Sequence, residues 1–236
     1  MAKKHKAYKS TLDKGYASEW NDNHIDDFST ELSDGLLFLG PALSTCWDTA
    51  QTAGGSAPVW ALVSGHAFVV LNTGGTTDQT SSMRYMLEGG VANITHPDDL
   101  PILTTALEVA AVKDAAGVAN SVVEFGFQDD SDAIFTENQH CAIFRIYNGK
   151  LHAVTGDGVD ETETEIADYD QYAHYRIEIL SSSVKFYVDN MVTAAATHTT
   201  HLPDADLTVK FSVRSKDNVN STIRVDAAAL QRLRKQ

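Results

Sequence analysis

The sequence predicts an all-β protein in which two antiparallel sheets pack face to face. Residues 172–198 carry the clearest signal, because apolar and polar residues alternate there in consecutive runs separated by short polar turns. In one run Val184, Phe186 and Val188 alternate with more polar side chains. Period-two alternation is typical of strands with one buried face. Consecutive strands joined by short turns run antiparallel, so this segment excludes a parallel α/β fold.

The other strands follow from the same alternation and from the turn residues between them. Glycine pairs and the dipeptide Asn148-Gly149 mark turns, and Asp189-Asn190 is expected to make a tight turn into a strand at 191–198. The segment 227–234 fits either a final strand or a short helical tail. The expected strands are 36–39, 43–48, 59–63, 67–72, 83–88, 104–112, 121–128, 141–147, 150–155, 162–167, 173–180, 183–189, 191–198, 206–214 and 222–227.

Several of these strands resemble those of concanavalin A-like (laminin G-like, glucanase-like) jelly-roll domains. The resemblance rests on Val123-Glu124-Phe125-Gly126-Phe127, on the hairpin around Asn148-Gly149 and on the late strands that end in Val188-Asp189-Asn190. It covers roughly residues 43–233 and implies an antiparallel two-sheet jelly-roll sandwich. It also favours a strand over a helix at 104–112. Such strand patterns are specific for the fold and say little about function.

Residues 1–34 differ from the rest and are expected to form an N-terminal arm, extended or with a short helix at 17–32, that precedes a jelly-roll domain at 35–236. Ser18-Glu19-Trp20-Asn21 and His24 resemble the openings of tailed-phage and archaeal-virus structural proteins. That resemblance implies an attachment arm. The residues expected to serve assembly are Trp20, Asn21, His24 and Phe28.

Composition narrows the functional classes. The chain has 236 residues and a formal net charge of −14, which argues against nucleic-acid binding through a basic face. No apolar run approaches the roughly 20 residues of a membrane-spanning helix. The opening residues 1–6 lack the apolar core of a signal peptide, so we expect no export by the usual secretory route.

For catalysis, the glucanase branch of this fold uses a carboxylate pattern along one strand, Glu-x-Asp-x-(x)-Glu. Aligning that pattern on Glu124 places Val122 and Asn120 where the other acids should be. One carboxylate cannot act both as acid and as nucleophile. The sequence therefore predicts no hydrolase of this kind, with Glu124 a polar residue on the open face of a sheet.

The predicted function is a non-enzymatic virion structural protein, such as a capsid decoration, a spike or a tail appendage, located in the virion. Its expected partners are other virion subunits in a homo-oligomer or symmetric assembly, and a surface glycan or host surface. No nucleic acid and no membrane span are expected. The alternatives are a free-standing carbohydrate-binding module and, third, a polysaccharide-active enzyme.

Candidate ligand sites are few. Tyr147, Tyr169 and Tyr172 are the aromatic residues most suited to binding a glycan. No cofactor is expected except calcium, for which the acidic loop with Asp129, Asp130 and Asp132 supplies oxygen ligands.

Two further pairs of residues are candidates, a histidine pair for metal binding and a cysteine pair for a disulfide. The spacing of His198 and His201 could hold a metal, although a hydrogen-bonded surface pair is the favoured interpretation. Cys46 and Cys141 could form a disulfide, but two buried thiols are expected.

Overall fold

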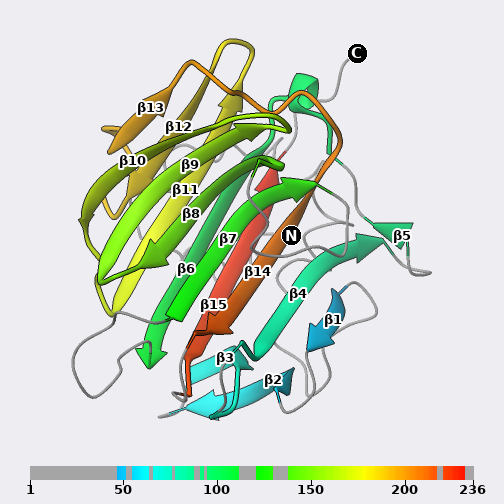
Figure 1. Ribbon diagram of the computed structural model, residues 1–236, viewed down its shortest axis with the longest axis vertical. Coiled ribbons are helices and arrows are strands. Elements are labelled where there is room, and N and C mark those ends of the chain that lie inside the picture. The colour runs from blue at the N-terminus through cyan, green and yellow to red at the C-terminus, as the bar shows by residue number, and fades with distance from the viewer. Residues whose placement is uncertain are drawn as a thin grey trace, which may run out of the picture.

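The computed structural model describes residues 47–51, 55–63, 66–75, 78–87, 91–92, 95–111, 121–129, 138–216 and 220–231. These residues form two antiparallel sheets that face each other, which confirms the predicted jelly-roll sandwich. Figure 1 shows the sheet that contains residues 121–129 and 140–147, called sheet A, in front of the sheet that contains residues 172–180 and 183–188, called sheet B. The only helix in these ranges is the short 3-10 turn η2 (Pro97–Asp99).

Each sheet is assembled from strands that lie far apart in the sequence. Sheet A has the order β1 (Trp47–Gln51), β4 (Thr80–Leu87), β14 (Leu207–Ser215), β7 (Ser121–Asp129), β8 (His140–Tyr147), β9 (Lys150–Asp157) and β10 (Glu161–Asp168), and β5 (Val91–Ala92) pairs with β4. Sheet B has the order β13 (Ala196–His198), β12 (Ser183–Val188), β11 (Tyr172–Leu180), β6 (Ile102–Ala111), β15 (Thr222–Gln231), β3 (His66–Asn72) and β2 (Ser56–Val63).

The core between the sheets is rich in aromatic rings. Phe125 and Phe144 of sheet A stack with their ring centroids 5.4 Å apart, and Tyr175 of sheet B meets Phe125 edge-on at 4.8 Å. Phe186 of β12 is fully buried and meets Phe144 edge-on, as expected for a core residue. Aromatic contacts of this kind add stability beyond the area they bury, so these rings hold the two sheets together.

Several local predictions are confirmed. The strand predicted at 104–112 is present as β6 up to Ala111, where this described range ends. Of the two alternatives for 227–234, the described part is a strand, because β15 runs to Gln231. Asn148 and Gly149 have φ angles of 50° and 78° and form the two-residue turn that joins β8 to β9. Positive φ at both turn positions is what such a hairpin requires, and Asn and Gly tolerate it best.

The prediction of a continuous strand at 191–198 is wrong in its first half, because β13 contains only Ala196–His198. Asp189 adopts a φ of 53°, and its side chain accepts a hydrogen bond from the backbone of His174. The Asn190 side chain then accepts hydrogen bonds from the backbone amides of Val192 and Thr193. Those local bonds replace the ladder bonds that a tight hairpin would need.

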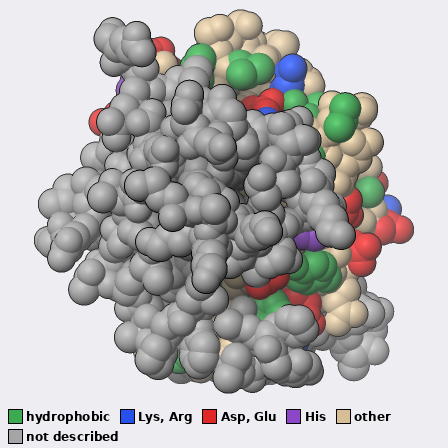
Figure 2. Space-filling view, turned by 180° about the vertical axis from the view of Figure 1, so that it is seen from behind, with side chains coloured by type: hydrophobic (Ala, Val, Ile, Leu, Met, Phe, Trp, Pro, Cys, Tyr) green, Lys and Arg blue, Asp and Glu red, His purple; other side chains and the backbone are tan. Residues whose placement is uncertain are grey.

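The described surface reflects the acidic composition, and Figure 2 shows more red than blue among the described side chains on the far side of the molecule. Cys141 is a buried free thiol, as predicted, whereas Cys46 lies outside the described residues. The predicted arm, with Trp20, Asn21, His24 and Phe28, also lies outside them. In the described part of the chain no helix is long and apolar enough to cross a membrane.

Candidate functional site

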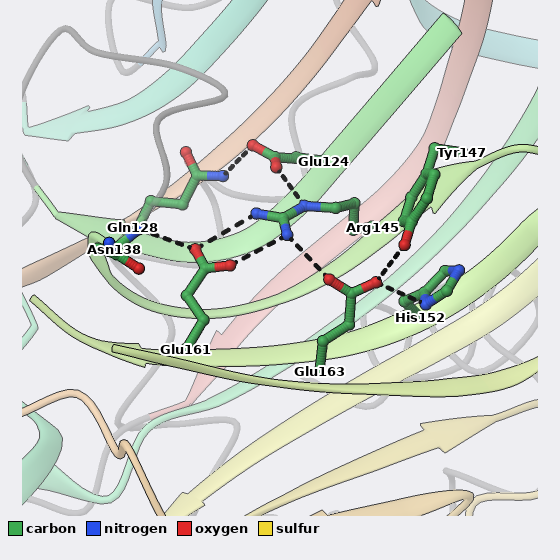
Figure 3. Close-up of polar contacts among 8 residues, drawn as sticks. All are labelled: Glu124, Gln128, Asn138, Arg145, Tyr147, His152, Glu161 and Glu163. Atoms are coloured by element: carbon green, nitrogen blue, oxygen red, sulfur yellow. Dashed lines mark hydrogen bonds and ion pairs between the residues drawn. The ribbon is translucent and has the colours of Figure 1, made fainter. Parts of the chain in front are cut away.

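Alternation along four neighbouring strands of sheet A brings a group of polar side chains together on its outer face. On β7 the residues Phe125 and Phe127 point into the core, so Glu124 and Gln128 point outward. The strands β8, β9 and β10 contribute outward side chains in the same way. Figure 3 shows the resulting group, which we call the Arg145 cluster: Glu124, Gln128, Arg145, Tyr147, His152, Glu161 and Glu163.

Arg145 lies at the centre of the cluster and contacts three carboxylates. Its Nε donates to Glu124 Oε1 at 2.7 Å, and its Nη1 donates to Glu161 Oε2 at 3.2 Å and to Glu163 Oε2 at 3.3 Å. The surrounding carboxylates raise the pKa of Arg145 although its burial opposes this. Three carboxylates around one guanidinium leave the cluster with an excess of negative charge.

Glu124 is the most enclosed acid of the cluster, with 3% of its surface exposed. Burial raises the pKa of Glu124, and Glu161 adds to this effect, while Arg145 counteracts it. A carboxyl group whose pKa is raised in this way can keep a proton at a higher pH than usual. That property is required of a general acid, and a neighbouring ionised carboxylate is the usual second member of such a pair.

Glu163 connects the arginine to an aromatic pair. Its Oε1 accepts the Tyr147 hydroxyl at 2.7 Å and lies 2.7 Å from Nδ1 of His152. The rings of Tyr147 and His152 stack with centroids 4.4 Å apart. The hydrogen bond to Glu163 is the main cause that raises the pKa of Tyr147 to about 12. Glu163 also fixes the orientation of the imidazole, so that His152 presents its Nε2 on the opposite side (Figure 3).

Three buried polar atoms on this face have no hydrogen-bond partner among the described residues. They are Oε1 of Gln128, Nε2 of His152 and Oγ of Ser212, which lies directly across from Glu124 on the neighbouring strand β14. A buried polar atom without a partner costs about 1–3 kcal/mol. Such atoms in one place indicate a site that a polar ligand or water completes.

Beside the charges, on the same outer face of β8 and β9, lies a small apolar group made of Cys141, Ile143 and Val154, all buried. Gly126 lies beside it with a φ of 140°, and a Cβ there would come within 2.5 Å of the Ala142 carbonyl oxygen. The position therefore accepts only glycine. These buried apolar neighbours exclude water from one side of the ion pairs, where each charge interaction is stronger than in solvent.

The prediction for Glu124 was wrong in two respects. Glu124 is buried rather than on an open face, and it does have acidic neighbours. The prediction considered partners along one strand only, whereas the neighbouring acids come from β10, three strands away in the sheet. The alternation of Glu161, Glu163 and Glu165 with threonines was the available signal, since it places three acids on one face of one strand.

The three predicted glycan-binding tyrosines do not converge. Tyr147 belongs to the Arg145 cluster. Tyr172 lies on sheet B, is 40% exposed, and donates its hydroxyl to Asp226. Tyr169 packs partly buried against the core. Glycan binding by these residues stays a prediction, and only Tyr147 lies among other candidate site residues.

The predicted calcium loop is mostly outside the described residues. Asp129 ends β7 and lies 4.0 Å from Lys210, while Asp130 and Asp132 fall in the undescribed part of the chain. In the described ranges no group of three or more His, Cys, Asp or Glu side chains is placed to hold a metal ion. Calcium binding in the 129–132 loop therefore stays a prediction.

Comparison with known proteins supports the fold. No protein-family model and no curated protein matches this chain. Among solved structures, a β-glucanase of Bacillus licheniformis superposes with a TM-score of 0.57 at 12% identity, over 84% of this chain and 96% of the other. An alginate lyase from a Corynebacterium species gives 0.58 at 12%, over 81% and 97%. A Mycobacterium tuberculosis protein described as an immunostimulatory antigen and pseudo beta-1,3-glucanase gives 0.56 at 10%, over 84% and 99%.

These neighbours correct the functional prediction. The jelly roll was expected to belong to a virion structural protein without enzymatic activity, but the similar structures are named as glucanases and alginate lyases. Nothing found supports the resemblance of the arm to phage or archaeal-virus proteins, nor the expected roles in a virion, a tail or host adhesion. At these identities the comparison establishes the fold alone, and the enzyme alternative accords with it better than the virion prediction does.

Proposed function

We propose that this protein is an enzyme that cleaves glycosidic bonds in a polysaccharide, with the Arg145 cluster as its active site. The observation that carries the proposal is the pairing of a buried glutamate of raised pKa, Glu124, with further carboxylates on the outer face of sheet A. Glycoside hydrolysis requires two carboxyl groups with different roles, one protonated and one ionised.

In this proposal Glu124 is the proton donor. It gives its proton to the glycosidic oxygen as the bond to the anomeric carbon breaks. Glu163 is the second carboxylate, because it is the more exposed of the two acids on β10 that contact Arg145, with 30% of its side chain exposed against 15% for Glu161. It acts on the anomeric carbon as a nucleophile or activates the attacking water, according to the separation of the two carboxyls in the bound complex.

The substrate class follows from the charge and from the unpartnered atoms. With Glu124 protonated, the carboxylates of Glu161 and Glu163 still outweigh the single charge of Arg145, so the cluster repels a polyanion and a neutral polysaccharide is favoured over a polyuronate. Oε1 of Gln128, Nε2 of His152 and Oγ of Ser212 offer hydrogen-bonding partners for sugar hydroxyls. A ligand hydroxyl that satisfies them would also remove the cost of leaving them buried without partners.

One observation favours a second candidate, a lyase that cleaves polyuronates by β-elimination. The imidazole of His152 is oriented by Glu163 at Nδ1 and has an unpartnered Nε2 beside Tyr147, an arrangement suited to removing a proton from a sugar carbon. Elimination also needs a cation to neutralise the uronate carboxylate. Arg145, the cation within the cluster, already contacts three carboxylates, which is why hydrolysis is the preferred proposal.

The test is an assay of the purified protein against a panel of neutral and acidic polysaccharides, in which the release of reducing ends is measured. Turnover of a neutral polysaccharide is expected. Glu124→Gln and Glu163→Gln should each lower the rate about 10²- to 10⁴-fold, the usual contribution of general acid–base catalysis. Glu165→Gln is the matched control, since Glu165 lies on the same strand and face but pairs with Lys150 at 3.4 Å, and it should retain activity.

The same assay distinguishes the two candidates by their products. Elimination from a polyuronate creates a conjugated double bond that absorbs ultraviolet light, whereas hydrolysis does not. Release of reducing ends from neutral polysaccharides without such absorbance supports hydrolysis. Absorbance that appears only with polyuronates and disappears in His152→Gln would show that the Arg145 cluster catalyses β-elimination instead of hydrolysis. No cleavage of any member of the panel would count against both.

A further inference from the structure

The strand that carries Glu161 and Glu163 is the last strand of sheet A. Among the described residues β10 has a strand neighbour on one side only, β9. Its acids point outward, so the alternate residues Thr162 and Thr164 point toward sheet B. There β10 lies beside β13, the last strand of sheet B. What holds β10 at this edge also sets where its acids lie.

His198 on β13 bridges the two sheets at this point. It is 3% exposed, its Nδ1 lies 2.9 Å from Thr155 Oγ1 on β9, and its Nε2 lies 3.0 Å from Thr164 Oγ1 on β10. A neutral imidazole has one donor and one acceptor nitrogen, and a hydroxyl can serve either. Both ring nitrogens are therefore satisfied, and His198 is neither the surface histidine nor the metal ligand considered from the sequence.

A second contact secures the start of the same strand. Thr162 Oγ1 lies 2.9 Å from Thr200 Oγ1 and 3.0 Å from Nδ1 of His201. His201 has a φ of 48°, a conformation uncommon for residues with a side chain. Thus both inward threonines of β10 are bound to the segment 198–201.

We propose that His198 is a positioning residue that clasps β10 against the edge of sheet B. By this clasp it keeps Glu161 and Glu163 within reach of Arg145. The contact itself stands on the geometry of Thr155, Thr164 and His198, while its consequence for catalysis rests on the function proposed above.

The clasp is sensitive to pH because none of the described side chains in contact with His198 carries a charge that would compensate its protonation. The side chains packed on it from β12 are apolar, and those from β9 and β10 are the neutral threonines. The glutamates of β10 lie on its opposite face. The titratable groups described along this edge include His201, bound to Thr162, and Asp157, whose pKa is lowered mainly by hydrogen bonds from the backbone of Asp160 and Val159.

The sign of the effect follows from burial, which lowers the pKa of His198 below its usual 6.5. A group whose pKa is lowered on folding contributes its full stability above the unfolded value and loses it as the pH falls toward the folded value. The clasp is therefore complete above about pH 6.5 and weakens below it. Protonation of His198 favours a state in which β10 has separated from β13 and the imidazolium is hydrated.

The test is hydrogen–deuterium exchange, read by mass spectrometry on the peptide that spans β10 and on the peptide that spans β7 as an internal reference. Rates are corrected for the intrinsic effect of pH. In the wild-type protein, exchange in β10 relative to β7 should rise as the pH falls from 7.5 to 5, because burial lowers the pKa of His198 and protonation then favours the open state. His198→Gln, which cannot be protonated, should remove this pH dependence.

A matched control and a second variant keep the test decisive. His174→Gln removes another partly buried histidine, one that lies 3.7 Å from Asp189 on sheet B and away from β10, and it should behave like the wild type. Thr164→Val removes the hydroxyl on β10 itself and should raise the exchange of β10 already at pH 7.5. If His198→Gln does not fold, the Thr164→Val result decides.

An unchanged pH dependence in His198→Gln, or no rise in the wild type, would overturn the clasp. Exchange does not depend on any substrate, so the clasp can be confirmed even if no polysaccharide is cleaved. If cleavage is found, the fall in kcat below pH 6.5 should shrink in His198→Gln while KM changes little. Equal kcat profiles in both proteins would contradict the positioning role.

Discussion

Two groups of arginine, glutamate and tyrosine lie on the outer faces of the two sheets, and they are built differently. On sheet B, Glu178 accepts hydrogen bonds from Arg176 and from the Tyr187 hydroxyl, and Arg224 pairs with Glu108 at 2.8 Å. On sheet A, Arg145 alone contacts three carboxylates. Buried polar atoms without a hydrogen-bond partner among the described residues occur on both faces, on Gln128, His152 and Ser212 of sheet A and at Nε of Arg224 on sheet B.

Ion pairs are found on both faces, so their presence alone does not identify a functional site. The pairs on sheet B join one cation to one anion, Arg176 to Glu178 within β11 and Arg224 to Glu108 across neighbouring strands. Both are ordinary ways to stabilise a sheet. The cluster on sheet A instead combines excess negative charge with a buried carboxyl of raised pKa, and both cost stability. A fold retains such costs where they serve a function.

Removing the central arginine should produce the largest difference between the two faces. Arg145→Met leaves buried acids without their cation, which typically costs about 3–5 kcal/mol. Arg224→Met breaks a more exposed pair on sheet B and should cost about 1 kcal/mol. Urea unfolding at pH 7 measures both changes. Losses of equal size would mean that the two faces do not differ as described.

The deficit of Arg145→Met should also shrink as the pH is lowered toward 4, because the stranded carboxylates then take up protons. A deficit that stays the same at pH 4 and pH 7 would instead assign the loss to packing of the arginine side chain.

The contribution of Glu124 to stability can be separated from that of the other acids by its dependence on pH. Because its folded pKa is raised above 4.5, its favourable contribution is present below that pH and is lost as the pH rises through the folded pKa. Glu124→Gln should therefore gain stability relative to the wild type as the pH increases from 4 to 8. Chemical denaturation at several pH values would show this. If the stability difference between Glu124→Gln and the wild type were constant or reversed with pH, Arg145 would lower the pKa of Glu124 at least as much as burial raises it.

The smallest expected effect concerns the core between the two faces. The Tyr175 hydroxyl is buried and has no hydrogen-bond partner among the described residues. Tyr175→Phe removes that unsatisfied group and should raise the unfolding free energy by about 1 kcal/mol, without an effect on cleavage. Tyr147→Phe removes a hydroxyl that donates to Glu163 and should lower cleavage instead. A destabilised Tyr175→Phe would reveal an undescribed partner of the hydroxyl.

The fold could be predicted from the sequence because it depends on local patterns. Alternation identified β11 and β12, and Asn148-Gly149 identified the turn between β8 and β9. The segment 191–195 was missed because Asn190 bonds its own neighbouring amides, a local competition that alternation does not reveal.

The candidate site was missed because it depends on strand order rather than on one strand. Glu124 and Glu163 are 39 positions apart in the sequence and meet only through Arg145, after β7, β8, β9 and β10 have paired in that order. A search for acids along β7 could not find them. The burial of Glu124 likewise depends on tertiary packing that no local pattern encodes.

The central claim is that the outer face of sheet A around Arg145 binds and cleaves a polysaccharide. The most direct test is a crystal structure of Glu124→Gln soaked with β-glucan oligosaccharides, since this variant should bind the sugar without cleaving it. We predict a sugar chain over β7, β8 and β14, with hydroxyl groups within hydrogen-bonding distance of Gln128 Oε1 and Ser212 Oγ. An oligosaccharide bound elsewhere, on sheet B for example, or an unoccupied face at saturating sugar, would contradict the claim.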